Sequence, residues 1–211
     1  MREISGRDKM KNKLHRRTIF FLTAVIFSQF FNLGKAGAVS MEKATFAGGC
    51  FWGVEKLFSE LEGVASTRVG YTGGHVKNPS YETVCGGFTG HAEAIEITFD
   101  PSKISYEKLL ETFFSYHDPT TVNRQGNDVG DQYRSAIFYH GTAQEKAAKK
   151  SIELLTQAKV FKNKIVTEVS PAGEFYDAEE YHQKYLKKNP NGYCHIHLQS
   201  RKIAEVLGNQ K

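Results

Sequence analysis

Five runs of alternating apolar and polar residues recur after residue 42, bounded by Gly, Pro or Asp. A period of two residues is typical of strands that bury one face. The expected strands are 43–47, 64–71, 92–99, 135–140 and 165–169.

Between and after these runs, apolar residues recur at the three- and four-residue spacing of amphipathic helices. In addition, Thr142-Ala-Gln-Glu145 and Asp177-Ala-Glu-Glu180 match the capping box that opens many helices. The expected helices are 51–61, 105–116, 143–157 and 178–187. Because strands and helices mix without strict alternation, we expect an α+β fold, built as an α/β two-layer sandwich.

Two long connections, 70–87 and 117–135, carry Gly, Asn and Pro. Connections longer than about 12–15 residues are usually functional or disordered. Because both hold aromatic, acidic and amide residues, we expect ordered loops that form the wall of a site. After the last expected helix we expect an irregular C-terminal tail.

The net charge of +5 comes from the first 38 residues, which hold eight Lys/Arg and two Asp/Glu. The rest of the chain carries 20 basic and 21 acidic residues. Charge is therefore balanced where a fold is expected, and no binding of nucleic acid is predicted.

The first 38 residues have the pattern of a secretory signal peptide. A basic run ends at Arg17, an apolar segment follows at 19–33, and Ala36-Gly37-Ala38 is a small-residue cleavage site. We expect a signal peptide at 1–38, one domain at 39–211, and a periplasmic or secreted protein. The alternatives are an uncleaved leader that anchors the protein to a membrane, and a cytoplasmic protein.

The chain has three cysteines, Cys50, Cys85 and Cys194. An odd number in an exported chain leaves at least one thiol outside any disulfide, which indicates cysteine chemistry. For Cys85 we expect a packed, inert thiol. Cys194 lies in the expected tail, from which a thiol can reach an oxidised Cys50 and form a disulfide. The competing interpretation is a metal site of Cys194, His195 and His197, for which no second ligand cluster is present.

Cys50 lies between two glycines and two aromatic residues, where an expected strand gives way to an expected helix. Backbone N–H groups at a helix N-terminus favour thiolate over thiol, and glycines let a substrate approach the backbone. Trp52 falls outside the apolar stripe of the helix, so we expect it to line a pocket. The sequence predicts a nucleophile beside aromatic rings; the alternative is a buried cysteine with Trp52 packed on a strand.

Strand parity places Glu93 on the same face as Ile95. A carboxyl on an apolar face loses solvation, its pKa rises, and it can act as a general acid. The alternative is that Glu93 lies at the edge of the strand, where its carboxyl would simply be solvated. Tyr81, Asp128 and Tyr133 lie in the two long connections, where they can form hydrogen bonds to a polar substrate group.

With these residues assembled, the chain resembles the A-type peptide-methionine (S)-S-oxide reductases, the MsrA family. The collinear matching segments are GGCFWGVE (48–55), VGYTGG (69–74), YETVCGGFTGHAEAIEITFDP (81–101), HDPT (117–120), RQGNDVGDQYRSAIF (124–138) and EEYHQKYLKKNPNGYC (179–194). The resemblance implies a central mixed β-sheet surrounded by helices. It also implies thiol-dependent reduction of methionine-S-sulfoxide, free or in proteins, to methionine.

The resemblance assigns a role to each candidate residue. Cys50 attacks the sulfoxide sulfur, Glu93 protonates the oxygen, and Cys194 converts the resulting sulfenic acid into a disulfide. The implied substrate-binding residues are Phe51 and Trp52 for the methyl group, and Tyr81, Asp128 and Tyr133 for the oxygen. It implies no bound cofactor or metal, a thioredoxin-like reductant that dithiothreitol replaces in vitro, and a monomer.

Two other classes of protein use the same cysteine. A cysteine hydrolase would pair Cys50 with a histidine such as His91 or His182. We expect His182, on the helix predicted at 178–187, to be a hydrogen-bonded interior residue instead. A redox-sensing module would form a disulfide between Cys50 and Cys194 without turnover of a sulfoxide.

Overall fold

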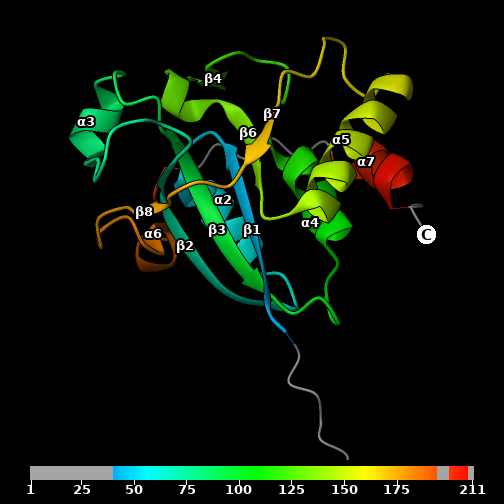
Figure 1. The fold of residues 1–211 in the computed structure, drawn as a ribbon, viewed down its shortest axis with the longest axis horizontal. Helices are drawn as coiled ribbons and strands as arrows, with labels where there is room; N and C mark the ends of the chain where they lie inside the picture. The colour runs from blue at the N-terminus through cyan, green and yellow to red at the C-terminus, as the bar shows by residue number, and fades with distance from the viewer. Residues whose placement is uncertain (1–39, 194–199, 209–211) are drawn as a thin grey trace, which may run out of the picture. The chain divides into compact units, whose positions relative to one another are not determined.

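The computed structural model describes residues 40–193 and 200–208, so the expected signal peptide and Cys194 lie outside the described residues. A six-stranded sheet with the order β7-β6-β1-β3-β2-β8 forms the centre of this part of the chain (Figure 1). Its strands are β1 (Glu42–Gly48), β2 (Val64–Thr72), β3 (Ala92–Phe99), β6 (Ser135–Tyr139), β7 (Glu168–Pro171) and β8 (Tyr176–Asp177). β6 and β7 pair parallel and the other neighbours antiparallel, so the sheet is mixed.

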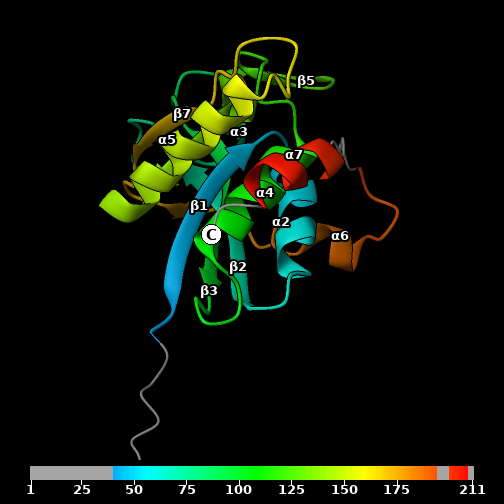
Figure 2. The same ribbon diagram turned by 90° about the vertical axis from the view of Figure 1, so that its right-hand side faces the viewer.

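Helices cover the sheet, and Figure 2 shows α2, α4 and α7 grouped together. The helices are α2 (Phe51–Ser59), α3 (Tyr81–Cys85), α4 (Tyr106–Tyr116), α5 (Thr142–Gln157), α6 (Tyr185–Lys188) and α7 (Ser200–Leu207). A two-stranded hairpin of β4 (Arg124–Gln125) and β5 (Asp128–Val129) and a single 3₁₀ turn at Asp131–Tyr133 complete the described elements. The α+β fold expected from the sequence is confirmed.

One apolar cluster joins α2, α4, α5 and α7 to a single face of the sheet. Phe46 of β1 stacks on Phe58 of α2 and on Phe113 of α4, with ring centroids 5.5 and 5.0 Å away. These rings are fully buried, as is Ile95 of β3. Burial of each such side chain contributes about 1.5–3 kcal/mol, so α2 and β3 are held firmly against each other.

The prediction of a helix at 178–187 is wrong. The segment follows the short strand β8, runs through turns, and becomes helical only at α6. Its polar side chains bond to distant parts of the fold instead of to a local helix. The side-chain amide of Gln183 donates to the carbonyl of Val69, and the Tyr71 hydroxyl donates to Glu179. Long-range bonds therefore replace the local ones that the capping pattern predicted.

Smaller differences concern helix starts and the ends of the sheet. Neither expected capping box forms, because α5 begins after Gly141 with no side-chain cap and Asp177 pairs in β8. The strand expected at 165–169 begins at Glu168, since the Val166 amide donates to a loop carbonyl instead. Helix α7 lies in the region where the sequence predicted an irregular tail.

Both long connections are ordered, as expected. The first contains α3, whose capping box is formed by Ser80 and Thr83. The second contains the β4–β5 hairpin and the 3₁₀ turn. Both segments therefore hold their side chains in defined positions.

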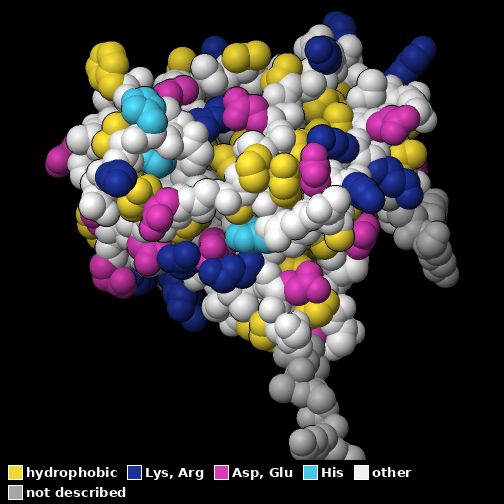
Figure 3. Space-filling view, viewed as in Figure 1, with side chains coloured by type: hydrophobic (Ala, Val, Ile, Leu, Met, Phe, Trp, Pro, Cys, Tyr) yellow, Lys and Arg dark blue, Asp and Glu magenta, His cyan; other side chains and the backbone are white. Residues whose placement is uncertain are grey.

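The surface seen in Figure 3 intersperses Lys and Arg with Asp and Glu, and no single basic patch covers it. Within the described ranges, no helix is both long and apolar enough to cross a bilayer.

Candidate active site

Cys50 lies at the N-cap of α2, one residue after Gly49 and two after the end of β1. Gly49 has a φ of +93°, a conformation that side chains rarely adopt, and a Cβ there would lie 2.6 Å from Gln125 Cγ. A Cβ on Gly48 would lie 2.4 Å from the hydroxyl of the buried Tyr116. The two glycines are therefore required to bring the chain close to the second long connection and to turn Cys50 to the start of the helix.

Glu93 lies on β3 with its carboxyl directed at the start of α2. It is 2% exposed, and its Oε2 accepts a hydrogen bond of 3.2 Å from the Phe51 amide. Burial, together with the smaller effect of the Asp128 charge, raises the pKa of Glu93 to about 8, against the lowering effect of the Phe51 N–H. Glu93 is therefore protonated at neutral pH, and the buried carboxyl expected from strand parity is confirmed.

A cavity of about 150 Å³ brings the candidate residues together. It is lined by Cys50, Phe51, Trp52, Tyr81, Glu93, Asp128, Tyr133 and Tyr193. These residues come from α2, α3, β3, β5, the 3₁₀ turn and the chain after α6. The cavity therefore holds every site residue predicted from the sequence except Cys194, which lies outside the described residues.

Two tyrosines in the cavity retain their hydroxyl protons. Burial raises the pKa of both Tyr81 and Tyr133, and the nearby Glu93 raises that of Tyr133 further. The Tyr193 hydroxyl donates to Asp128 Oδ1 over 3.1 Å. The cavity therefore offers hydroxyl groups and a carboxyl group, which match the partners of a polar, oxygen-bearing substrate group.

Trp52 forms one wall of the cavity and has two neighbours from the distant C-terminal part of the chain. Its indole ring stacks on Tyr185 with centroids 3.8 Å apart and planes at 16°. Its N–H donates to Nδ1 of His182 over 3.0 Å. The expectation that Trp52 lines a pocket is confirmed, and its ring packs on α6 rather than on a strand.

The histidines do not favour a cysteine hydrolase. His182 is an interior residue, as expected, but it lies in a turn and burial lowers its pKa. Its Nδ1 accepts from Trp52, and its Nε2 has no hydrogen-bond partner among the described residues. His91 Nδ1 accepts from the Gly74 amide and its Nε2 pairs with the Val76 carbonyl, so both ring nitrogens are occupied. Neither histidine is placed as a base for Cys50.

Sequence reasoning missed several residues that build the site. Tyr193 lines the cavity, and Tyr185 supports Trp52. Glu179 accepts from the Tyr81 amide over 2.8 Å and from the Tyr71 hydroxyl over 2.9 Å, which ties α3 to β2. The one available signal was that Tyr193 directly precedes Cys194.

The expectation that Cys85 is a packed thiol is wrong. Cys85 is exposed, at the C-terminal end of α3. A packed thiol is the default for such a cysteine, and the sequence did not predict α3, whose last residue is Cys85. Partial burial raises its pKa above the ordinary value.

No group of three or more His, Cys, Asp or Glu in the described part of the chain is arranged to hold a metal ion. The alternative metal site of Cys194, His195 and His197 lies outside the described residues.

Comparison with known proteins is consistent with this geometry. The family model of peptide methionine sulfoxide reductase matches residues 42–210. The chain belongs to this family. Peptide methionine sulfoxide reductase MsrA of Methanothermobacter thermautotrophicus is 59% identical over 155 residues, which are 74% of this chain and 92% of the relative.

Solved structures of the family have the same fold. Reduced Mxr1 of Saccharomyces cerevisiae superposes with a TM-score of 0.70 and 40% identity, covering 78% of this chain and 95% of Mxr1. Mxr1 in complex with Trx2 gives a TM-score of 0.51 and 28% identity, covering 79% of this chain and 96% of that one.

Proposed function

We propose that the protein reduces methionine-S-sulfoxide, free or in proteins and peptides, to methionine and so repairs oxidised methionine. The observation that carries this proposal is the cavity in which Cys50 and a protonated Glu93 lie at the same helix end. Family membership supports it, because relatives such as the one from Methanothermobacter are named for this reduction.

The reaction transfers one oxygen atom from the substrate to Cys50. The Cys50 sulfur attacks the sulfoxide sulfur while Glu93 gives its proton to the oxygen. A sulfoxide oxygen is a poor leaving group until it is protonated, so a buried acid with a raised pKa is suited to this step. The protonated oxygen passes to the Cys50 sulfur as the S–O bond and the bond between the two sulfurs break. Methionine leaves reduced by two electrons, Cys50 is oxidised to a sulfenic acid, and Glu93 is left deprotonated.

The remaining cavity residues would bind the two ends of the sulfoxide group. Phe51 and Trp52 provide apolar surface for the S-methyl group. Tyr81 and Tyr133 are hydroxyl donors for the sulfoxide oxygen, with Asp128 beside them. Because the cavity is small, it favours a methyl sulfoxide over bulkier groups.

The proposal is tested with the two separated diastereomers of a methionine sulfoxide peptide and dithiothreitol as reductant. We expect the S epimer to be consumed and the R epimer to persist. Chromatography measures the amount of each. Equal loss of both epimers would contradict a shaped site, and loss of neither would contradict the reductase and favour the redox-sensing module.

Cys194 is proposed to restore the enzyme by attacking the sulfenic acid, which forms a Cys50–Cys194 disulfide and releases water. Without reductant, Cys194→Ser is expected to release one methionine per protein and to stop at a sulfenic acid that dimedone traps. Wild-type protein is expected to stop at the disulfide instead. Cys85→Ser is the matched control, because trapping in that variant instead would show that Cys85 is the resolving thiol.

The reductant is proposed to be a thioredoxin-like dithiol, since Mxr1 was solved in complex with Trx2. No bound cofactor or metal is needed, because the oxygen and both electrons pass between sulfur atoms. We propose that the protein acts as a monomer.

The first 38 residues are proposed to export the protein, so that its mature N-terminus is Val39. N-terminal sequencing of protein purified separately from the medium or periplasm, the membranes and the cytoplasm is expected to find it outside the cytoplasm with a sequence that begins at Val39. A sequence that begins at Met1 would indicate an uncleaved leader, and one that begins at Met41 would indicate a cytoplasmic protein.

A further inference from the structure

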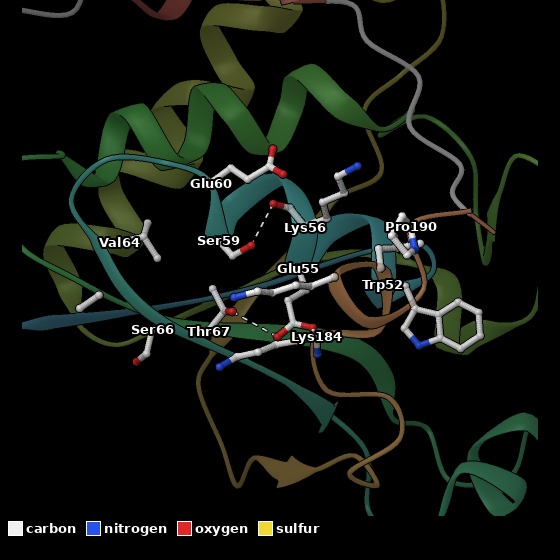
Figure 4. Close-up of a pocket in the computed structure, with 13 residues that line it drawn as sticks. Trp52, Glu55, Lys56, Ser59, Glu60, Val64, Ser66, Thr67, Lys184 and Pro190 are labelled. Carbon is white, nitrogen blue, oxygen red and sulfur yellow. Dashed lines mark hydrogen bonds between the residues drawn. The ribbon is translucent and has the colours of Figure 1, made fainter. Parts of the chain in front are cut away.

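A second, larger pocket of about 550 Å³ adjoins the Cys50 cavity. It lies between the outer stripe of α2, the first residues of β2, and α6 with the turn that follows it (Figure 4). Trp52 lines both this pocket and the Cys50 cavity. We call the larger pocket the α2 groove.

The α2 groove extends away from the catalytic cysteine along one side of α2. Its lining includes Trp52, Lys56, Ser59 and Glu60, which recur at helical spacing. At 1.5 Å per residue, the eight steps from Trp52 to Glu60 cover about 12 Å. An extended peptide advances about 3.3–3.6 Å per residue, so about three residues next to a bound sulfoxide would fill this length.

The floor of the α2 groove is held in place by Glu55. This carboxylate is 2% exposed and accepts from the Thr67 hydroxyl over 3.1 Å and from the Lys184 amide over 2.6 Å (Figure 4). Both oxygens therefore bond to the protein, and Glu55 ties the start of α6 to α2 and β2. The groove exists before a ligand arrives.

The charged groups at the mouth of the α2 groove are mainly basic. Lys56, Lys184 and Lys187 are exposed and line it, whereas Glu60 is the one exposed carboxylate among its lining residues. With Glu55 turned inward, the mouth carries a net positive charge. A ligand with carboxylate side chains is complementary to it.

We propose that the α2 groove binds the polypeptide stretch next to the oxidised methionine and favours stretches that carry Asp or Glu. The inference rests on the proposed function, because a sulfoxide bound in the Cys50 cavity is what positions the neighbouring polypeptide in the α2 groove. Each exposed ion pair contributes little to binding. A preference of roughly threefold to tenfold in kcat/KM is therefore expected for three lysines, and it should weaken as salt is added.

The test uses blocked peptides with one methionine-S-sulfoxide, flanked on one side or the other by glutamates or by glutamines. Dithiothreitol is the reductant. The Glu-to-Gln ratio of kcat/KM is expected to exceed one for acidic residues on one side of the sulfoxide only. Since both peptides are measured on the same protein, a general change in activity cancels from the ratio.

The double variant K56Q/K187Q is expected to bring this ratio close to one. Lys184 is left intact, because it adopts a left-handed conformation (φ +53°) at the N-cap of α6, where the backbone is tied to Glu55. The matched control is K146Q/K150Q, which removes two exposed lysines from α5, away from the groove. This control is expected to keep the wild-type ratio.

Three results would contradict the proposal. The first is a wild-type ratio of one on both sides, and the second is a preference that persists in K56Q/K187Q. The third is a K56Q/K187Q variant that keeps the wild-type peptide ratio but has a raised KM for a thioredoxin-type protein. This result would make the groove a docking site for the reductant. In all three, reduction of free methionine-S-sulfoxide would continue; its absence would contradict the proposed function itself.

Discussion

Replacing Cys50 with serine is expected to stop sulfoxide reduction without unfolding the protein. A serine hydroxyl is a far weaker nucleophile than a thiolate, and it forms neither a sulfenic acid nor a disulfide. Cys50 also occupies the N-cap of α2 and makes no side-chain cap hydrogen bond there. Serine is one of the favoured N-cap residues, so the same change is expected to leave stability equal or to raise it by up to about 1 kcal/mol.

Two measurements separate these effects in Cys50→Ser. Methionine release from the S epimer reports activity, and thermal unfolding monitored by circular dichroism reports stability. Cys85→Ser removes the exposed thiol of α3 and is expected to keep most of the activity. Methionine release by Cys50→Ser at a rate near that of wild type would show that another group is the nucleophile. A clear fall in its Tm would show that the thiol is needed for the fold.

The part of the site that could be predicted from sequence depends on local patterns. Strand parity places Glu93 correctly, because its register with β2, where it pairs with Tyr71, has no irregularity at this residue. The apolar stripe of α2 likewise includes Phe51 and Val54, which are buried, and excludes Trp52, which lines the cavity. Both patterns repeat every two to four residues, so a short stretch of sequence is enough to detect them.

The part that could not be predicted depends on contacts between residues far apart in the sequence. Glu55 bonds to a residue 129 positions later, and Tyr71 to one 108 positions later. These bonds hold the chain out of a helix as far as Lys184, although the local pattern of 178–187 favours one. The same segment supplies His182 and Tyr185 to Trp52, so the aromatic wall of the cavity could not be assembled from local signals.

Replacing Glu93 with glutamine is expected to lower kcat by about a hundredfold to ten-thousandfold, the usual range for removal of a general acid. Glutamine has nearly the same shape, and its oxygen can still accept from the Phe51 amide. The matched control is Glu96→Gln on the same strand, whose carboxylate faces away from the cavity and pairs with Lys43 and Arg68. This control is expected to keep its activity, and an equal loss in both variants would contradict a specific role for Glu93.

The pH dependence gives Glu93→Gln a second, independent readout. Burial raises the pKa of Glu93 from its ordinary 4.5 to about 8, so the folded protein keeps a proton that the unfolded chain has already lost. The stability linked to this proton is fully present below pH 4.5 and is lost as the pH rises to about 8. The wild-type rate is expected to fall above pH 8 for the same reason, because the acid is then deprotonated. Urea unfolding measured between pH 4.5 and 8 should show a free energy of unfolding that falls as the pH rises. Glu96→Gln should retain this fall, and Glu93→Gln should lack it. A fall that survives unchanged in Glu93→Gln would place the titrating group elsewhere.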